Sequence, residues 1–127
     1  MKLLTKAIVQ ELPAFGEGTN EAVVKFFAPW SNWTWYGCEA VVLLETDDNE
    51  IIERKLSDVD YAFFDMFNTG EEVRLDGMKI LDVLFYGYVE GLFDEWGTFS
   101  LKELSELRGP FGLKVERDLH WKKKLVG

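Results

Sequence analysis

The sequence has 127 residues, of which 47% are hydrophobic and 15% aromatic. A chain of this length and composition can bury a core of its own, which excludes a disordered chain. We predict a single domain over residues 1–127. Cys38 is the only cysteine, which excludes a disulfide within the chain, and no apolar run reaches the ~20 residues needed to cross a bilayer. With no signal-like N-terminus and a formal net charge of −9, we expect a cytoplasmic protein that binds neither a membrane nor duplex nucleic acid.

The first half of the chain predicts one helix and three strands. Thr5 is a favourable N-cap, Ile8 and Leu12 are four residues apart, and Pro13 ends the helix. After a glycine-rich loop, β-branched and aromatic residues predict strands over residues 22–28, 33–45 and 50–56, the last two joined by a turn at 46–49.

A second helix is predicted from the N-cap Ser57 to Gly70, with its apolar side chains on one face: Val59, Phe63, Met66 and Phe67. Asp76-Gly77 then suits the tight turn of a hairpin between residues 73–75 and 78–80. Two more strands are expected over residues 84–90 and 96–99.

The third helix has the clearest local signal. Ser100 and Glu103 form a capping box, with the buried stripe expected at Leu101, Leu104 and Leu107 and the C-terminal cap at Gly109. Residues 113–119 alternate as a final strand. Strands outnumber helices and the connections are short, so the sequence predicts an α+β fold, a mostly antiparallel or mixed sheet with about three short helices.

Three blocks of the sequence resemble a family of small bacterial proteins known as domain of unknown function 2958. They are LLTK…LP (residues 3–13), VKFFAPWSNWTWYGCE (24–39), and FYGYVEGLFDEWGTFSLKEL followed by GPFGLKVERDLHW (85–121). The resemblance implies an origin in bacteria, plasmids, conjugative elements or phage, and it implies no established activity or catalytic residue. Residues 40–83 are longer and more acidic than in compact members, which suggests an inserted hairpin and helix segment.

The tryptophans are the first candidate site. Trp33 and Trp35 share one face of the predicted strand, and Trp30 follows Pro29 in a loop, where we expect it to be the most accessible. Exposed, these indoles could stack bases or bind a peptide; buried, they fill the core.

The final strand places Glu116, Asp118 and His120 on one face. With Glu39 from a neighbouring strand they could hold Mg²⁺ or Zn²⁺, or serve as general acid and base. The other interpretation is a solvated face with ion pairs to lysines, and we expect no metal and no cofactor. Arg117 lies on the presumed core face and needs a carboxylate, so we predict a structural ion pair with Glu39, with Glu90 as the other possible partner.

Residues 39–95 carry 16 acidic and 4 basic side chains, whereas residues 96–127 carry 4 acidic and 7 basic ones. The acidic side chains could imitate a phosphate backbone and occupy the basic groove of a nucleic-acid-binding protein, or they could simply keep the protein soluble. Glu71, Glu72 and Asp76 are the binding residues of the first hypothesis; the others are Asp47, Asp48, Glu50, Glu53, Asp58, Asp60 and Asp65.

We therefore expect a non-enzymatic protein-binding module of a bacterial mobile element or phage, with an acidic surface that acts as a decoy for a nucleic-acid-binding partner. Two alternatives stay open. One is a metal-dependent hydrolase that acts on phosphoesters through Glu116, Asp118 and His120. The other is a binder of nucleotides or single-stranded nucleic acid through Trp30, Trp33 and Trp35.

Overall fold

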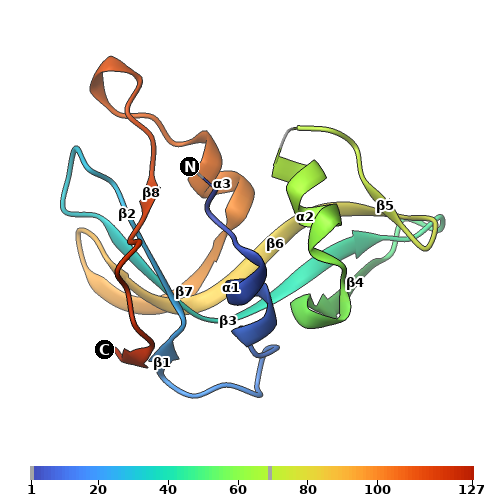
Figure 1. Ribbon diagram of the computed structural model, residues 1–127, viewed down its shortest axis with the longest axis horizontal. Helices are drawn as coiled ribbons and strands as arrows, with labels where there is room; N and C mark the ends of the chain where they lie inside the picture. The colour runs from blue at the N-terminus through green and yellow to red at the C-terminus, as the bar shows by residue number, and fades with distance from the viewer. Residues whose placement is uncertain (1, 69) are drawn as a thin grey trace.

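Two long antiparallel strands run through the centre of the protein (Figure 1). The computed structural model describes residues 2–68 and 70–127. In it, β3 (Thr34–Glu45) pairs with β6 (Met78–Glu90) along its whole length, from Thr34 opposite Glu90 to Glu45 opposite Lys79. These two strands connect opposite ends of the molecule. Every other strand of the main sheet pairs either with one of them or with a strand that does.

The shorter strands flank different ends of the central pair. On β3 they are β2 (Val24–Phe27) and β4 (Ile51–Lys55), and on β6 they are β5 (Arg74–Leu75) and β7 (Asp94–Ser100). The outermost strand, β8 (Glu116–Arg117), pairs with β2, and a separate ribbon joins β1 (Glu21–Ala22) to β9 (Lys124–Leu125). All pairs are antiparallel, which confirms the α+β prediction with a mostly antiparallel sheet.

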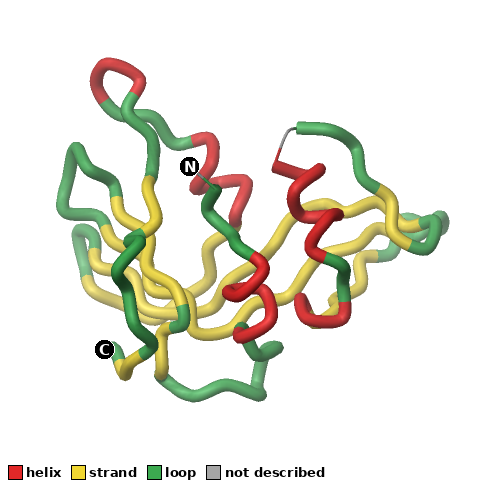
Figure 2. Tube along the Cα trace, in the orientation of Figure 1, coloured by secondary structure: helices red, strands yellow, loops and turns green. Residues whose placement is uncertain are grey.

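The helices gather over one face of the sheet (Figures 1 and 2). They are α1 (Lys6–Glu11), α2 (Tyr61–Asn68) and α3 (Leu101–Glu106), with short 3₁₀ turns η1 (Leu56–Asp58) and η2 (Pro110–Gly112). Thr5 and Ser100 cap α1 and α3, as predicted, by accepting hydrogen bonds from the amides of Ile8 and Glu103. No helix within the described residues is long and apolar enough to cross a membrane.

One hydrophobic core lies between the helices and the sheet. Phe26, Phe85 and Phe99 contact one another there, with ring centroids 5.5 Å apart for Phe26 and Phe85 and 5.2 Å apart for Phe85 and Phe99. The helical side contributes Leu4, Val9, Leu12, Leu56, Phe64, Leu101 and Leu104. Residues 40–83 also supply buried side chains, so the strands and the helix of this segment pack in the same core.

Two β-bulges change which side chains face the core. In β3, Cys38 is the extra residue between the pairs Gly37–Gly87 and Glu39–Tyr86. In β6, Leu81 is the extra residue opposite Leu43 and Leu44. Because a bulge shifts the alternation by one residue, Trp35 faces the core before the first bulge, whereas Ala40, Val42 and Leu44 face it afterwards. The bulge at Leu81 joins what the sequence predicted as two strands into one.

The second helix differs from the prediction. Ser57 lies in η1, and α2 begins at Tyr61, where the Asp60 carboxylate accepts a hydrogen bond from the Ala62 amide (3.0 Å). In α2 the Phe64 side chain is fully buried, whereas Met66 is exposed. The predicted stripe was therefore wrong at Met66 and missed Phe64.

The predicted final strand over residues 113–119 is reduced to Glu116–Arg117. On one side, residues 108–114 close on themselves as a loop, with the Gly109 amide bonded to the Leu113 carbonyl at 2.8 Å. On the other side, the Asp118 carboxylate accepts a hydrogen bond from the His120 amide (2.9 Å), which turns the chain. Leu113 and Leu119 are consequently exposed, and so is Leu107, because α3 ends at Glu106 rather than continuing to Gly109.

Candidate protein-binding surfaces

The three candidate tryptophans lie in different environments. Trp35 is buried in the core with 6% of its surface exposed, whereas Trp33 is 39% exposed and stacks on it at a centroid distance of 5.9 Å. Trp30 is half-buried and lies against Gly109, so the prediction that it is the most accessible of the three is wrong. The loop that carries it folds back onto residues 108–114, an arrangement that depends on tertiary packing.

The structure does not gather Glu116, Asp118 and His120 into one group of ligands. Asp118 uses one carboxylate oxygen for the His120 amide and lies 3.8 Å from the Lys25 ammonium through the other. The chain turns after β8, so the expected common strand face ends before His120, whose side chain is exposed. Within residues 2–68 and 70–127, no group of three or more His, Cys, Asp or Glu side chains could hold a metal ion.

Arg117 and Glu39 are separated by the strand register. Arg117 pairs with Phe26, which pairs with Trp35, while Glu39 lies four residues further along β3. The buried Glu39 carboxylate accepts a hydrogen bond from the Gly18 amide at 2.7 Å, in the gap that the ends of β2 and β4 leave along β3.

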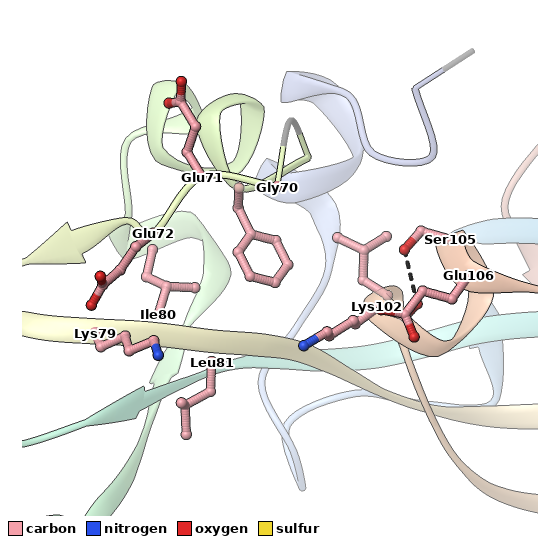
Figure 3. Close-up of a pocket in the computed structure, with 11 residues that line it drawn as sticks. Gly70, Glu71, Glu72, Lys79, Ile80, Leu81, Lys102, Ser105 and Glu106 are labelled. Atoms are coloured by element: carbon pink, nitrogen blue, oxygen red, sulfur yellow. Dashed lines mark hydrogen bonds between the residues drawn. The ribbon is translucent and has the colours of Figure 1, made fainter.

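Glu71 and Glu72 border a groove of about 370 Å³ between α2, α3 and β6 (Figure 3). In the close-up Glu71 points away from the groove, whereas Glu72 points toward β6 and the side of Lys79. Lys79 and Lys102 also line the groove, together with Glu106. The groove therefore mixes both signs of charge and is not an acidic pocket.

One end of the molecule, on the right in Figure 1, collects the acidic turns of the chain. The β3–β4 and β5–β6 turns meet there, since Glu45 lies opposite Lys79 and Arg54 pairs with Asp76 at 3.1 Å. We call residues 45–53 and 71–77 the acidic end; its exposed carboxylates are Asp47, Asp48, Glu50, Glu53, Glu71, Glu72 and Asp76. Within the described residues, only Glu72 and Asp76 of this set form ion pairs, with Arg74 and Arg54.

The remaining acidic residues of the hypothesis lie elsewhere. Asp60 caps α2, Asp65 pairs with Lys2 at 2.6 Å, and Asp58 lies in η1. These three belong to the helical side of the protein. The predicted acidic surface is therefore divided, and seven of its ten carboxylates belong to the acidic end.

The opposite end exposes apolar side chains on loops. Leu92 and Phe93, in the β6–β7 turn, are 84% and 81% exposed, and Phe111 in η2 is fully exposed. Trp33 packs over Gly91 and Trp30 over Gly109, so each of these loops is held by one indole of the β2–β3 loop. Exposed apolar side chains on supported loops are typical of interaction surfaces.

A row of aromatic side chains, which the sequence analysis missed, crosses the sheet face that points away from the helices. Tyr36, Tyr88 and Trp96 are successive cross-strand partners on β3, β6 and β7. Trp121 continues the row at 5.5 Å from Tyr36, and Tyr86 stacks on Trp96 at 5.9 Å with an interplanar angle of 20°. We call these five residues the aromatic row. The spacing of Tyr86 and Tyr88, two apart in a predicted strand, was the available signal.

Both signs of charge border the aromatic row. Lys25, the cross-strand partner of Tyr36, lies 5.8 Å from the Tyr36 centroid and 5.7 Å from that of Trp121, and Lys124 lies 4.7 Å from Trp121. Burial raises the pKa of Tyr36 to about 12, helped by a hydrogen bond to Glu90 and by the charges of Glu90, Asp118 and Asp94. The pKa of Tyr88 is raised as well, by desolvation and by Asp94 and Glu90.

Cys38 is buried at the bulge of β3. Burial raises the pKa of its thiol to about 11, and the neighbouring Glu39 carboxylate adds to the shift. A buried thiol that stays protonated at neutral pH is a poor nucleophile, so Cys38 acts as a small apolar side chain in the sheet.

Comparison with known proteins confirms the family resemblance over the C-terminal part of the chain. Residues 81–126 match the family described as protein of unknown function (DUF2958). They contain most of β6, all of β7 and α3, and the segment through β8 and β9, including four of the five aromatic-row residues. No curated protein and no solved structure matches the chain. The chain is therefore similar to the DUF2958 family of proteins of unknown function over residues 81–126.

Proposed function

We propose that the protein is a non-enzymatic protein-binding module of a bacterial mobile element or phage, and that its acidic end occupies the basic groove of a nucleic-acid-binding partner. The observation that carries the proposal is the meeting of the β3–β4 and β5–β6 turns, which brings the exposed carboxylates of Asp47, Asp48, Glu50, Glu53 and Asp76 to one end of the molecule, with Glu71 and Glu72 on the segment that leads into β5. The proposed origin in a bacterial mobile element or phage rests on the resemblance to the DUF2958 family.

The charge balance at the acidic end favours a basic partner. Asp47, Asp48, Glu50, Glu53 and Glu71 form no ion pair with another described residue, so their charges are available to a ligand. A concentration of like charges attracts a partner of opposite charge and raises the rate of association, and salt screens the attraction. The binding should therefore weaken as the ionic strength rises.

A pull-down from a bacterial lysate at low and high salt tests the proposal. We expect a nucleic-acid-binding protein to be retained at low salt and lost at high salt. Charge reversal at the acidic end, Asp47→Lys with Asp48→Lys or Glu71→Lys with Glu72→Lys, should abolish the retention. The control Glu11→Lys with Glu21→Lys makes the same change of charge on α1 and β1.

Each outcome of the pull-down bears on the proposal. Loss of the partner with the acidic-end variants but not with the control supports it. A partner that the acidic-end variants retain as well as the unchanged protein places the contact elsewhere and contradicts the decoy. A pull-down that retains no nucleic-acid-binding protein at low salt contradicts the choice of partner.

A further inference from the structure

The aromatic row is divided into two halves by its own lysines. The Trp121–Tyr36 half carries Lys25 and Lys124 over its rings. The other half consists of Tyr86, Tyr88 and Trp96, and within the described residues no lysine or arginine lies over these three rings. We call this second half the outer half of the row. At one end of the row, the rings of Tyr36 and Trp121 thus contact lysine side chains of the protein itself. At the other end, the outer half presents similar rings.

The rings of the outer half pack on one another and are partly exposed. Both tyrosines contact the Trp96 indole: Tyr88 at a centroid distance of 5.3 Å with an interplanar angle of 61°, and Tyr86 at 5.9 Å with an angle of 20°. Tyr86 is 37% exposed, and Gly127 lies beside the Trp96 indole. Two paired strands, β6 and β7, hold these rings in register. A ligand would therefore meet rings that are already in place, and little conformational entropy would be lost in ordering them.

Carboxylates flank the outer half. Glu90 and Asp94 are cross-strand partners on β6 and β7, and they form the next pair along the same face after Tyr88 and Trp96. Neither carboxylate forms an ion pair with a described residue. Aromatic rings bordered by unpaired carboxylates complement a cation, since the ring faces and the carboxylates attract the same charge.

We infer that the outer half of the aromatic row, with Glu90 and Asp94, binds an arginine side chain of a basic segment in the protein partner. The inference rests on the proposed function, because it assigns the chemistry of a partner that the acidic end attracts. A guanidinium stacks flat on aromatic rings while its N–H groups donate to carboxylates, which an ammonium does less well. At the outer half, the phosphates of single-stranded nucleic acid would instead meet Glu90 and Asp94 and be repelled.

The test is a titration of the isotope-labelled protein with a hexa-arginine peptide, followed by the backbone amide shifts in its NMR spectrum. We expect the largest shifts in residues 86–96. Asp94→Asn and Tyr86→Ser should each weaken binding about three- to fivefold, the size of one cation–aromatic or charge contact. Hexa-lysine should bind more weakly than hexa-arginine. The amide spectrum of each variant also shows whether the fold is intact.

The matched control is Asp47→Asn, which removes the same charge from the acidic end and should leave the affinity for hexa-arginine nearly unchanged. Equal weakening by Asp47→Asn and Asp94→Asn would mean that only the overall charge matters, which overturns the inference. So would shifts confined to residues 45–53 and 71–77, no binding of the peptide, or shifts of the row caused by an oligothymidylate instead.

The titration and the pull-down can fail separately. Peptide shifts confined to the acidic end would remove the arginine site and leave the proposed function standing. Shifts in residues 86–96, combined with a pull-down that retains no nucleic-acid-binding protein, would keep the arginine site and remove the proposed partner.

Discussion

The indole of Trp30 lies directly against the backbone of Gly109, so closely that a Cβ atom built on Gly109 would be 2.2 Å from Trp30 Cδ2. Gly109 has φ −99° and ψ −168°, a conformation that any residue adopts. Glycine is therefore needed at this position for the close approach of the ring rather than for its backbone freedom. The contact joins the β2–β3 loop to residues 108–114, at the end of the molecule where Leu92, Phe93 and Phe111 are exposed.

Gly109→Ala should destabilise the protein by about 1–3 kcal/mol, because the added methyl group overlaps the Trp30 ring. The control is Gly97→Ala, where the added Cβ meets nothing within 4 Å and should cost no stability. Urea unfolding measures both. In a Trp30→Leu background the cost of Gly109→Ala should shrink, and an unchanged cost would show that the indole is not its cause.

Phe111→Ala should leave the free energy of unfolding within about 0.5 kcal/mol of its original value, because the Phe111 side chain is fully exposed. Phe85→Ala removes the same atoms from a fully buried ring and should cost about 3–5 kcal/mol. Thermal or urea unfolding compares the two variants. A large loss with Phe111→Ala would mean that the loop of residues 108–114 packs on the body in solution through this ring.

The raised pKa of Tyr36 predicts a loss of stability at alkaline pH. The phenol ionises at about pH 10 in the unfolded chain and at about 12 in the folded protein, so the unfolded state releases its proton first. The contribution is fully present below pH 10 and is lost as the pH rises toward 12. Tyr36→Phe should show a smaller decline over this range than the unchanged protein in unfolding measured by circular dichroism. Identical declines would contradict the burial of the Tyr36 hydroxyl beside Glu90.

Ser100→Ala should destabilise the protein by about 1 kcal/mol, because the Ser100 hydroxyl accepts a hydrogen bond from the Glu103 amide at the start of α3. Ser105→Ala is the matched control in the same helix. The Ser105 hydroxyl donates to the Lys102 carbonyl, which the helix does not need, so its removal should cost less than about 0.5 kcal/mol. Equal losses in urea unfolding would mean that the cap contributes nothing of its own.

Local signals in the sequence predicted local structure well. The caps at Thr5 and Ser100 form as expected, and the Asp76-Gly77 turn has positive φ angles of 51° and 79°, as a type I′ turn requires. In each case the groups that interact are two to four residues apart. Their geometry is therefore decided by the chain itself before any tertiary contact forms.

Alternation of side chains predicted strands but not their faces across a bulge. The extra residues Cys38 and Leu81 shift the pattern, and each is fixed only by the register of β3 against β6. The same dependence explains the short β8. Residues 113–119 alternate like a strand, yet pairing with β2 ends where the Asp118 turn begins.

The sequence by itself determined the α+β class, the helix caps, the hairpin turn and the acidic character of the middle segment. Only the tertiary structure decided which carboxylates share the acidic end, and that Trp30 is held by Gly109 while Trp35 is buried. It also decided the aromatic row, which joins residues from β3, β6, β7 and the C-terminal segment. Such contacts depend on strand register between residues that are tens of positions apart, and no local preference encodes that register.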